Sequence, residues 1–466
     1  MGSMLVLFVV FGVVGLFGIE IFVDRYAWLV DPSWYRLTQE EPLQFGCHQF
    51  RPVEFEQEPA QGVTRILMMG GSTTFGFPTR PVGEAPISRP AHGYVGLVDT
   101  ALENSNPGGF EVINLGINGG STVDTLRLLR RGEGWGADVL VVYDGNNEFL
   151  QVPESFSPRL WRFALVRQLG ILIPRPMASP GWVGAPAVGS DKHLDAVLSV
   201  FRHNLESIVD LAHGQEMKVL LATQAVNLTE VDPNWSTGGS SDTLTELDTL
   251  SDAEVESLWE QQPDVADLAW EVGQRRLASG ADALEALQAA VDLDGLQLRA
   301  SSDVNRVIRE VAAQKGATLV DAATAIRSVP QKGLFFDWVH PTAKGARILA
   351  ASVLDGLEQA GVVSNTPVPA SSNVPEEDVV AGTLRAARSW LQWACVRGHD
   401  PTWRLQKAEE RARQVLALSP QEAEAHAVVD LATGWHGSPV ELEPSIIKRF
   451  LPLHPCIAEH VALPQL

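Results

Sequence analysis

The sequence predicts an α/β protein in which a parallel sheet is covered by helices on both faces. Short apolar runs recur along the chain, and stretches of helical composition lie between them. Apolar runs of this kind are typical of strands buried on both faces, as in parallel sheets. Their alternation with helices favours a three-layer α/β domain. The expected strands are residues 65–69, 112–115, 139–143, 218–222 and 318–321, and the expected helices are residues 92–103, 122–131, 193–213 and 345–359.

Length and composition limit the classes of function. A chain of 466 residues predicts more than one domain, and a hydrophobic content of 45% is ample for a packed core. The net charge of −22 disfavours nucleic acid as a partner, because phosphate binding needs clustered basic residues. Cys47, Cys395 and Cys456 lack the spacing of metal ligands, so no metal site is expected. Cys395 and Cys456 are compatible both with a disulfide and with two buried free thiols.

The N-terminal segment predicts a membrane anchor. Residues 2–19 contain no charged side chain, and the apolar run continues past Glu20 to Asp24. About 20 apolar residues suffice to cross a bilayer, and the segment has no polar stripe. No small-residue cleavage site follows, which favours an uncleaved anchor over 1–24 and an exported remainder, periplasmic or extracellular. Whether the chain continues upstream of Met1 stays open.

The rest of the chain divides into four expected parts. Residues 25–61, with four spaced prolines, look like a poorly regular connector. The α/β domain spans 62–361 and includes an insertion at about 228–300 that departs from its rhythm. In this insertion Ser251 and Glu254 have capping-box spacing, and residues 266–293 predict a helix pair. A lid or wall of a substrate pocket and a purely structural flap are both open for it. A linker over 362–377 precedes a helical segment over 378–466.

The helical segment is similar to one tetratricopeptide-like helix pair. Residues 407–418 are alanine-rich and periodic. Ser419 and Pro420 then predict the N-cap and first residue of a second helix, with Glu422 completing a capping box. One such unit is too little for a solenoid, which needs about three repeats. Packing against the α/β domain is therefore favoured over a docking site for another protein.

Residues suited to a catalytic or binding site follow three of the predicted strands. Ser72 comes after Gly70 and Gly71 at the end of the first strand, where α/β folds bind ligands. Gly119 follows the second strand and lets an exposed backbone N–H approach a ligand. Asn147 follows the third strand, and its side-chain amide is suited to donate to an oxyanion. Each segment alone is compatible with ordinary turn chemistry.

Asp337 and His340 stand three residues apart just before the closing helix. At that spacing on a turn, a carboxylate can orient an imidazole, and His340 would take the Ser72 proton as general base. His92 is a rival base by residue type alone. It lacks a carboxylate at matching spacing, so His340 is favoured.

These four segments, in this order, resemble the blocks of the SGNH, or GDSL-like, hydrolase superfamily over about residues 63–360. The matches are Gly70-Gly71-Ser72 for the serine block, Val112, Asn114 and Gly119 for the glycine block, Gly145 and Asn147 for the asparagine block, and Asp337 with His340 for the last block. Glu148 departs from the family's usual aspartate. The resemblance implies a flavodoxin-like fold and an oxyanion hole formed by the Ser72 N–H, the Gly119 N–H and the Asn147 side chain.

The resemblance implies a serine esterase that needs no cofactor and acts through an acyl-enzyme on an ester-containing small molecule, lipid or glycan. A second hypothesis is acyl transfer or deacetylation on a cell-envelope polysaccharide, because Ser72, Gly119, Asn147, Asp337 and His340 would serve it equally well. A third is a non-catalytic scaffold that binds a partner through its C-terminal helices. Intact Ser72, Asp337 and His340 argue against the third hypothesis.

Overall fold

A computed structural model provides the coordinates of the chain. It describes residues 35–37, 43–47, 53–80, 89–131, 135–151, 191–234, 247–371, 374–394 and 402–435, with short pieces between 437 and 462. The expected anchor over 1–24 and the cysteines at 395 and 456 lie outside the described residues. Within the described ranges, no helix combines the length and the apolar character that a membrane span requires. The anchor and the disulfide stay predictions.

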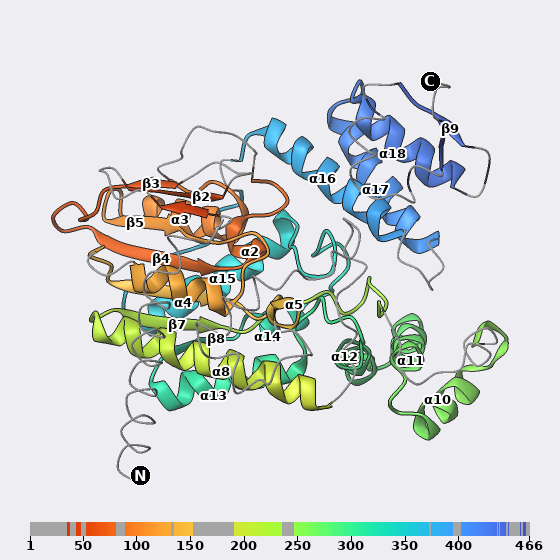
Figure 1. The fold of residues 1–466 in the computed structure, drawn as a ribbon, viewed down its shortest axis with the longest axis horizontal. Coiled ribbons are helices and arrows are strands. Elements are labelled where there is room, and N and C mark those ends of the chain that lie inside the picture. Colours follow the sequence, from red (N-terminus) through yellow and green to blue (C-terminus); the bar gives the residue numbers. More distant parts are fainter. Residues whose placement is uncertain are drawn as a thin grey trace, which may run out of the picture.

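The central sheet is parallel and has five strands in the order β5-β4-β6-β7-β8 (Figure 1). This is the flavodoxin-like order, and its switch point lies between β4 and β6, whose carboxyl ends form the expected place for a ligand. The predicted strands are confirmed, with small differences at their ends. They are β4 (Thr64–Gly70), β5 (Phe110–Asn114), β6 (Val139–Tyr143), β7 (Lys218–Ala222) and β8 (Thr318–Val320).

Helices cover both faces of this sheet, because successive side chains of each strand point to opposite sides. On β4, Ile66 and Met68 pack into one apolar cluster, whereas Leu67 and Met69 pack into the other. The first cluster contains α3 (Gly93–Ser105) and α15 (Ala343–Gln359); the second contains α4 (Thr122–Arg131), α8 (Asp191–Gly214) and α13 (Ser302–Lys315). The three-layer prediction is therefore correct. Short helices α2 (Ser72–Phe75), α5 (Glu148–Gln151) and α14 (Ala322–Arg327) follow β4, β6 and β8.

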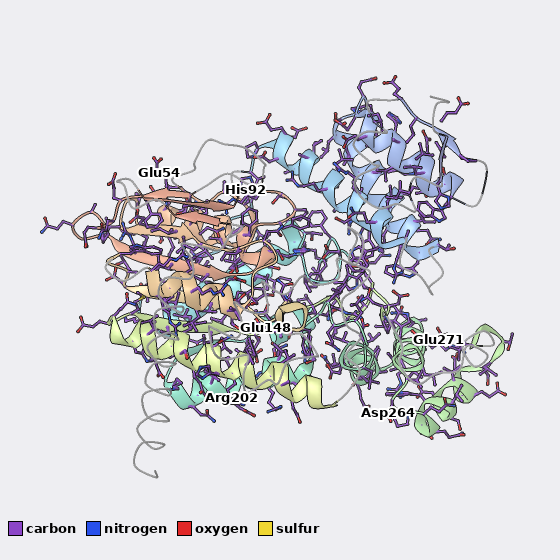
Figure 2. The ribbon with its side chains drawn as sticks, in the orientation of Figure 1. Glu54, His92, Glu148, Arg202, Asp264 and Glu271 are labelled. Atoms are coloured by element: carbon purple, nitrogen blue, oxygen red, sulfur yellow. The ribbon has the colours of Figure 1, made fainter. Side chains whose placement is uncertain are left out.

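The insertion between β7 and β8 is helical, as expected. After a 3₁₀ turn, η2 (Leu247–Thr249), come α10 (Asp252–Gln261), α11 (Ala266–Ser279) and α12 (Leu284–Asp292). The predicted capping box is present, with the Ser251 N–H donating to the Glu254 carboxylate at 2.7 Å. These helices have a small apolar core of their own. They lie beyond the end of the sheet, where Figure 2 labels Asp264 and Glu271.

The expectation of a poorly regular connector over 25–61 is wrong. This segment contains an antiparallel sheet of β1 (Tyr35–Leu37), β2 (Leu43–Cys47) and β3 (Val53–Phe55). The strands are too short for a clear periodic pattern, and the prolines around them favour irregular structure. Tertiary packing defines the last strand: Val53 and Phe55 are buried, and the Phe55 ring meets Trp135 edge-on at 5.4 Å.

The C-terminal region forms α16 (Glu376–Ala394), α17 (Thr402–Leu418) and α18 (Ala423–Gly434), followed by paired strands β9 (Val440–Glu441) and β10 (Val461–Ala462). The predicted N-cap at Ser419 is wrong. The Glu422 N–H donates to the Ser419 carbonyl at 3.1 Å in a turn. Glu422 itself is the N-cap, and its side chain accepts the Glu424 N–H. The proline therefore lies in the turn rather than in the helix.

Candidate active site

Ser72 lies where β4 meets α2, at the carboxyl edge of the sheet. Gly70 ends β4 with a φ of +156°, and a Cβ there would come within 2.2 Å of the Tyr143 carbonyl on β6. Only glycine allows the two strand ends to approach so closely. Ser72 then starts α2, and its backbone N–H has no acceptor within the helix because it belongs to the first turn.

Ser72, His340 and Asp337 form a continuous hydrogen-bonded chain. Ser72 Oγ lies 2.7 Å from His340 Nε2, and His340 Nδ1 lies 2.7 Å from Asp337 Oδ2. The remaining carboxylate oxygen of Asp337 accepts the backbone N–H groups of Val339 and His340, both at 3.0 Å. This local turn explains the three-residue spacing, because it brings the carboxylate back beside the imidazole.

The environment of Asp337 favours the ionised carboxylate. Burial acts to raise the pKa of this group, but the neighbouring His340 and the hydrogen bonds from His340 and Val339 outweigh it. They hold the pKa of Asp337 below its ordinary value. A negative charge at Asp337 is what orients the His340 ring and stabilises a positive charge on it.

Asn147 and Ser72 line the same small pocket. Its lining comes from the last residue of β6 and from the segments that follow β4, β6 and β7: Gly71, Ser72, Thr73, Tyr143, Asp144, Gly145, Asn146, Asn147 and Gln224. Asn147 Nδ2 donates to the Gly120 carbonyl at 2.8 Å, and an amide nitrogen carries a second N–H. Gly119, with φ of +73°, is exposed and adjoins that acceptor. The structure thus brings Gly119 and Asn147 to neighbouring positions at this edge of the sheet.

Glu148, the departure from the family pattern, is buried beside this edge (Figure 2). Its carboxylate accepts the Thr122 N–H at 3.0 Å and the Thr122 hydroxyl at 2.8 Å. It therefore ties the segment that carries Asn147 to the start of α4. Burial, with the neighbouring charge of Asp144, raises the pKa of Glu148 to about 8. Burial likewise raises the pKa of Asp144 to about 7.

The rival base His92 has a different environment. It is buried, and His92 Nε2 lies 3.1 Å from Asp378 Oδ2 on α16, at the place that Figure 2 marks. Sequence spacing gave no sign of this carboxylate, which comes 286 residues later. The imidazole that contacts Ser72 is that of His340.

The sequence analysis also missed Asn227, which binds backbone carbonyl groups of the loop that carries His340. Its side chain donates to the Asp337 carbonyl at 3.1 Å, and its backbone N–H donates to the Trp338 carbonyl at 2.9 Å. At the other end of the insertion, the Ala300 N–H donates to Asn146 at 2.9 Å. Both ends of the insertion therefore meet loops of the site. No motif could reveal these contacts, because they depend on the tertiary fold.

The flavodoxin-like sheet and the residues at its edge define the class: an SGNH-type serine hydrolase that acts on ester bonds. Residues 68–348 match the model of the GDSL-like Lipase/Acylhydrolase family, and the chain belongs to that family. No curated protein matches the chain.

Three solved structures are among those to which the chain is similar. LAE5, an alpha/beta hydrolase enzyme from the Lake Arreo metagenome, is 14% identical, with a TM-score of 0.34 over 65% of this chain and 97% of its own. Axe2, an acetylxylan esterase from Geobacillus stearothermophilus, is 18% identical, with a TM-score of 0.32 over 64% of this chain and 96% of its own. A lipase/acylhydrolase from Enterococcus faecalis is 17% identical, with a TM-score of 0.33 over 64% of this chain and 96% of its own. The assignment rests on the family model rather than on these similarities.

The raised pKa of Glu148 predicts a pH-dependent stability. Between its ordinary value of 4.5 and its folded value of about 8, the folded state holds a proton that the unfolded state has lost. The free energy of unfolding should therefore fall as pH rises through this window. Glu148→Gln keeps an acceptor for Thr122 without titrating, so its fall should be smaller than that of the wild type. Denaturant titrations at pH values from about 5 to about 8, which span this window, measure the difference.

Glu285→Gln removes an exposed carboxylate of the insertion and is the matched control. Its unfolding free energy should depend on pH as that of the wild type does. Identical pH dependence in Glu148→Gln and the wild type would show that the Glu148 carboxylate is not held neutral by burial.

Proposed function

We propose that the chain is a serine esterase that hydrolyses a carboxylic ester through an acyl-enzyme. The observation that carries this proposal is the hydrogen-bonded chain Ser72–His340–Asp337, with both links at 2.7 Å. Ser72 Oγ attacks the ester carbonyl while His340 Nε2 takes its proton. His340 then gives that proton to the leaving alcohol. Water, activated by the same imidazole, releases the acid and restores Ser72.

The second half of this chemistry is stabilisation of the oxyanion that forms on attack. The proposed donors are the backbone N–H groups of Ser72 and Gly119 and the side-chain amide of Asn147. Two observations support them: Ser72 and Asn147 line one pocket, and the Asn147 amide is held by the Gly120 carbonyl, next to Gly119. Preorganised donors of this kind supply much of the rate in acyl chemistry.

The proposed location is outside the cytoplasmic membrane, periplasmic or extracellular, with residues 1–24 as the anchor. The support is the uncharged stretch over residues 2–19. The substrate is then an ester-containing small molecule, lipid or glycan that reaches this side of the membrane. A tetratricopeptide-like role for the C-terminal helices, with a protein partner, is the weaker proposal because α16 and α17 contact the α/β domain directly.

The central test is substitution of the proposed nucleophile. Ser72→Ala removes the attacking oxygen, so hydrolysis of p-nitrophenyl acetate should fall by about 10⁴-fold or more, as for other serine hydrolases. A fluorophosphonate probe should label the wild-type protein at Ser72 and leave the variant unlabelled. If Ser72→Ala retains wild-type hydrolysis, the esterase mechanism is wrong. A wild-type protein that neither turns over nor reacts with the probe would favour the scaffold hypothesis.

The oxyanion donors have a separate kinetic signature. Asn147→Ala should lower kcat by roughly 10²–10³-fold with little change in KM, because the contact forms only in the transition state. The unfolding midpoint is measured beside the kinetics, since Asn147 also bonds the Gly120 carbonyl. An unchanged kcat in a folded Asn147→Ala protein would remove Asn147 from the oxyanion hole.

Product analysis separates hydrolysis from acyl transfer, which uses the same residues. The wild type is incubated with p-nitrophenyl acetate and a xylo-oligosaccharide acceptor, and both acetate and acetylated sugar are quantified. Hydrolysis predicts free acetate as the dominant product with or without the sugar. Acetylated sugar formed at the expense of acetate would favour the transferase.

A further inference from the structure

The loop that carries Asp337 and His340 is held through its carbonyl groups. Each carbonyl from residue 335 to residue 339 accepts a hydrogen bond from another part of the chain. The donors are Arg411 Nη2 to Phe335 at 2.8 Å, Trp390 Nε1 to Phe336 at 2.8 Å, Asn227 Nδ2 to Asp337 at 3.1 Å, the Asn227 N–H to Trp338 at 2.9 Å and, more weakly, Thr73 Oγ1 to Val339 at 3.4 Å. Within the loop, the Phe336 N–H donates to the His340 carbonyl at 2.7 Å.

Two of these donors belong to the C-terminal helices, outside the residues that match the family model. Trp390 on α16 is 1% exposed, and its ring stacks on Trp338 with centroids 4.6 Å apart. Arg411 on α17 is 5% exposed, and its guanidinium lies 5.3 Å from the centre of the Phe336 ring. Both side chains combine a hydrogen bond to the loop with a ring contact, which fixes the loop in position and in rotation.

Helix α16 also contacts the segment that follows Ser72. Arg385 Nε donates to the Pro78 carbonyl at 2.8 Å, and Arg385 Nη2 donates to the Arg80 carbonyl at 2.8 Å. Within this segment the Phe77 ring lies 4.5 Å from the His340 ring. Helix α16 therefore contacts the chain on both sides of the Ser72–His340 hydrogen bond.

Close backbone packing supports this contact. A Cβ at Gly382 of α16 would lie 2.6 Å from the Thr79 Cα, so glycine is needed for the approach. At the start of α16, Asp378 pairs with the buried His92 at the N-terminus of α3. Helix α16 is thus joined to the α/β domain at its beginning and again near its end (Figure 1).

We propose that Trp390 and Arg411 are positioning residues for the reaction at Ser72. They fix the loop that bears His340, so α16 and α17 complete the active site instead of forming a separate module. This inference rests on the proposed esterase function. A base must be held within about 0.5 Å of its productive place, and a displacement of about 1 Å can cost 10²-fold in rate. The bonds within the loop join its residues to one another, whereas Trp390 and Arg411 join it to helices far away in the chain.

The first test uses the full-length chain and Trp390→Phe, which keeps a ring against Trp338 but removes the Nε1 donor. Hydrolysis of p-nitrophenyl acetate should show a kcat lowered by roughly 10-fold to 10²-fold and a KM within about twofold. Trp435→Phe is the matched control, since Trp435 is also a buried tryptophan of the C-terminal region but stacks on His460. Its kcat should equal that of the wild type.

A second pair of variants guards against a simple loss of folding in Trp390→Phe. Arg411→Met retains much of the side-chain length and removes the donor to the Phe335 carbonyl. Arg413→Met, two residues on, removes an arginine that is exposed and bonds Glu409. The proposal predicts a lowered kcat in Arg411→Met alone, with unfolding midpoints above the assay temperature in both.

Hydrogen exchange of the loop tests positioning independently of catalysis. Exchange of the amides over 335–340, followed by mass spectrometry, should accelerate in Trp390→Phe and Arg411→Met and stay at the wild-type rate in the two controls. If the wild type does not hydrolyse the ester but the exchange pattern is as expected, the esterase proposal fails while the loop's dependence on α16 and α17 stands. Wild-type kcat together with wild-type exchange in both variants would overturn the proposal.

Discussion

The hydrogen bond between His340 Nε2 and Ser72 Oγ joins residues 268 positions apart, and much of the molecule is arranged around it. Ser72 is fixed by the end of β4, where Gly70 packs against the Tyr143 carbonyl. His340 is on a loop without regular secondary structure, so its place depends on hydrogen bonds from other segments. A buried loop must have its carbonyl groups paired, and the pairing of this one also determines where the imidazole lies.

Several layers of the structure meet at that loop. Asn227 binds two of its carbonyl groups, and the Asn227 carbonyl in turn accepts Arg299 Nη1 at 2.9 Å. Arg299 is fully buried next to Asp294 in the insertion. Trp390 and Arg411 bind two further carbonyl groups of the loop. The insertion and the C-terminal helices, which are both additions to the five-stranded sheet, therefore share one structural role at the edge where Ser72 lies.

The sheet and its helices could be predicted from the sequence because strands buried on both faces are apolar without interruption. Ser72, Gly119, Asn147, Asp337 and His340 could be singled out because their segments follow predicted strands or precede the closing helix, and together resemble the SGNH blocks in the right order. Their chemical roles stay predictions that this geometry supports. The N-terminal strands were missed because they are short and gain their definition from packing, as Phe55 does on Trp135. Trp390 and Arg411 carried no signal, since a buried aromatic or a helical arginine is usually explained by core packing or solvation.

The proposed reaction depends on covalent attack by Ser72, and trapping the intermediate tests that step most directly. The wild-type protein is mixed with excess p-nitrophenyl acetate, quenched in acid during turnover and digested for peptide mass spectrometry. The acyl-enzyme mechanism predicts an acetyl group on Ser72, formed with the burst of p-nitrophenol and lost as acetate appears. Steady hydrolysis with an unmodified Ser72, or with the acetyl group on a different residue, would contradict it.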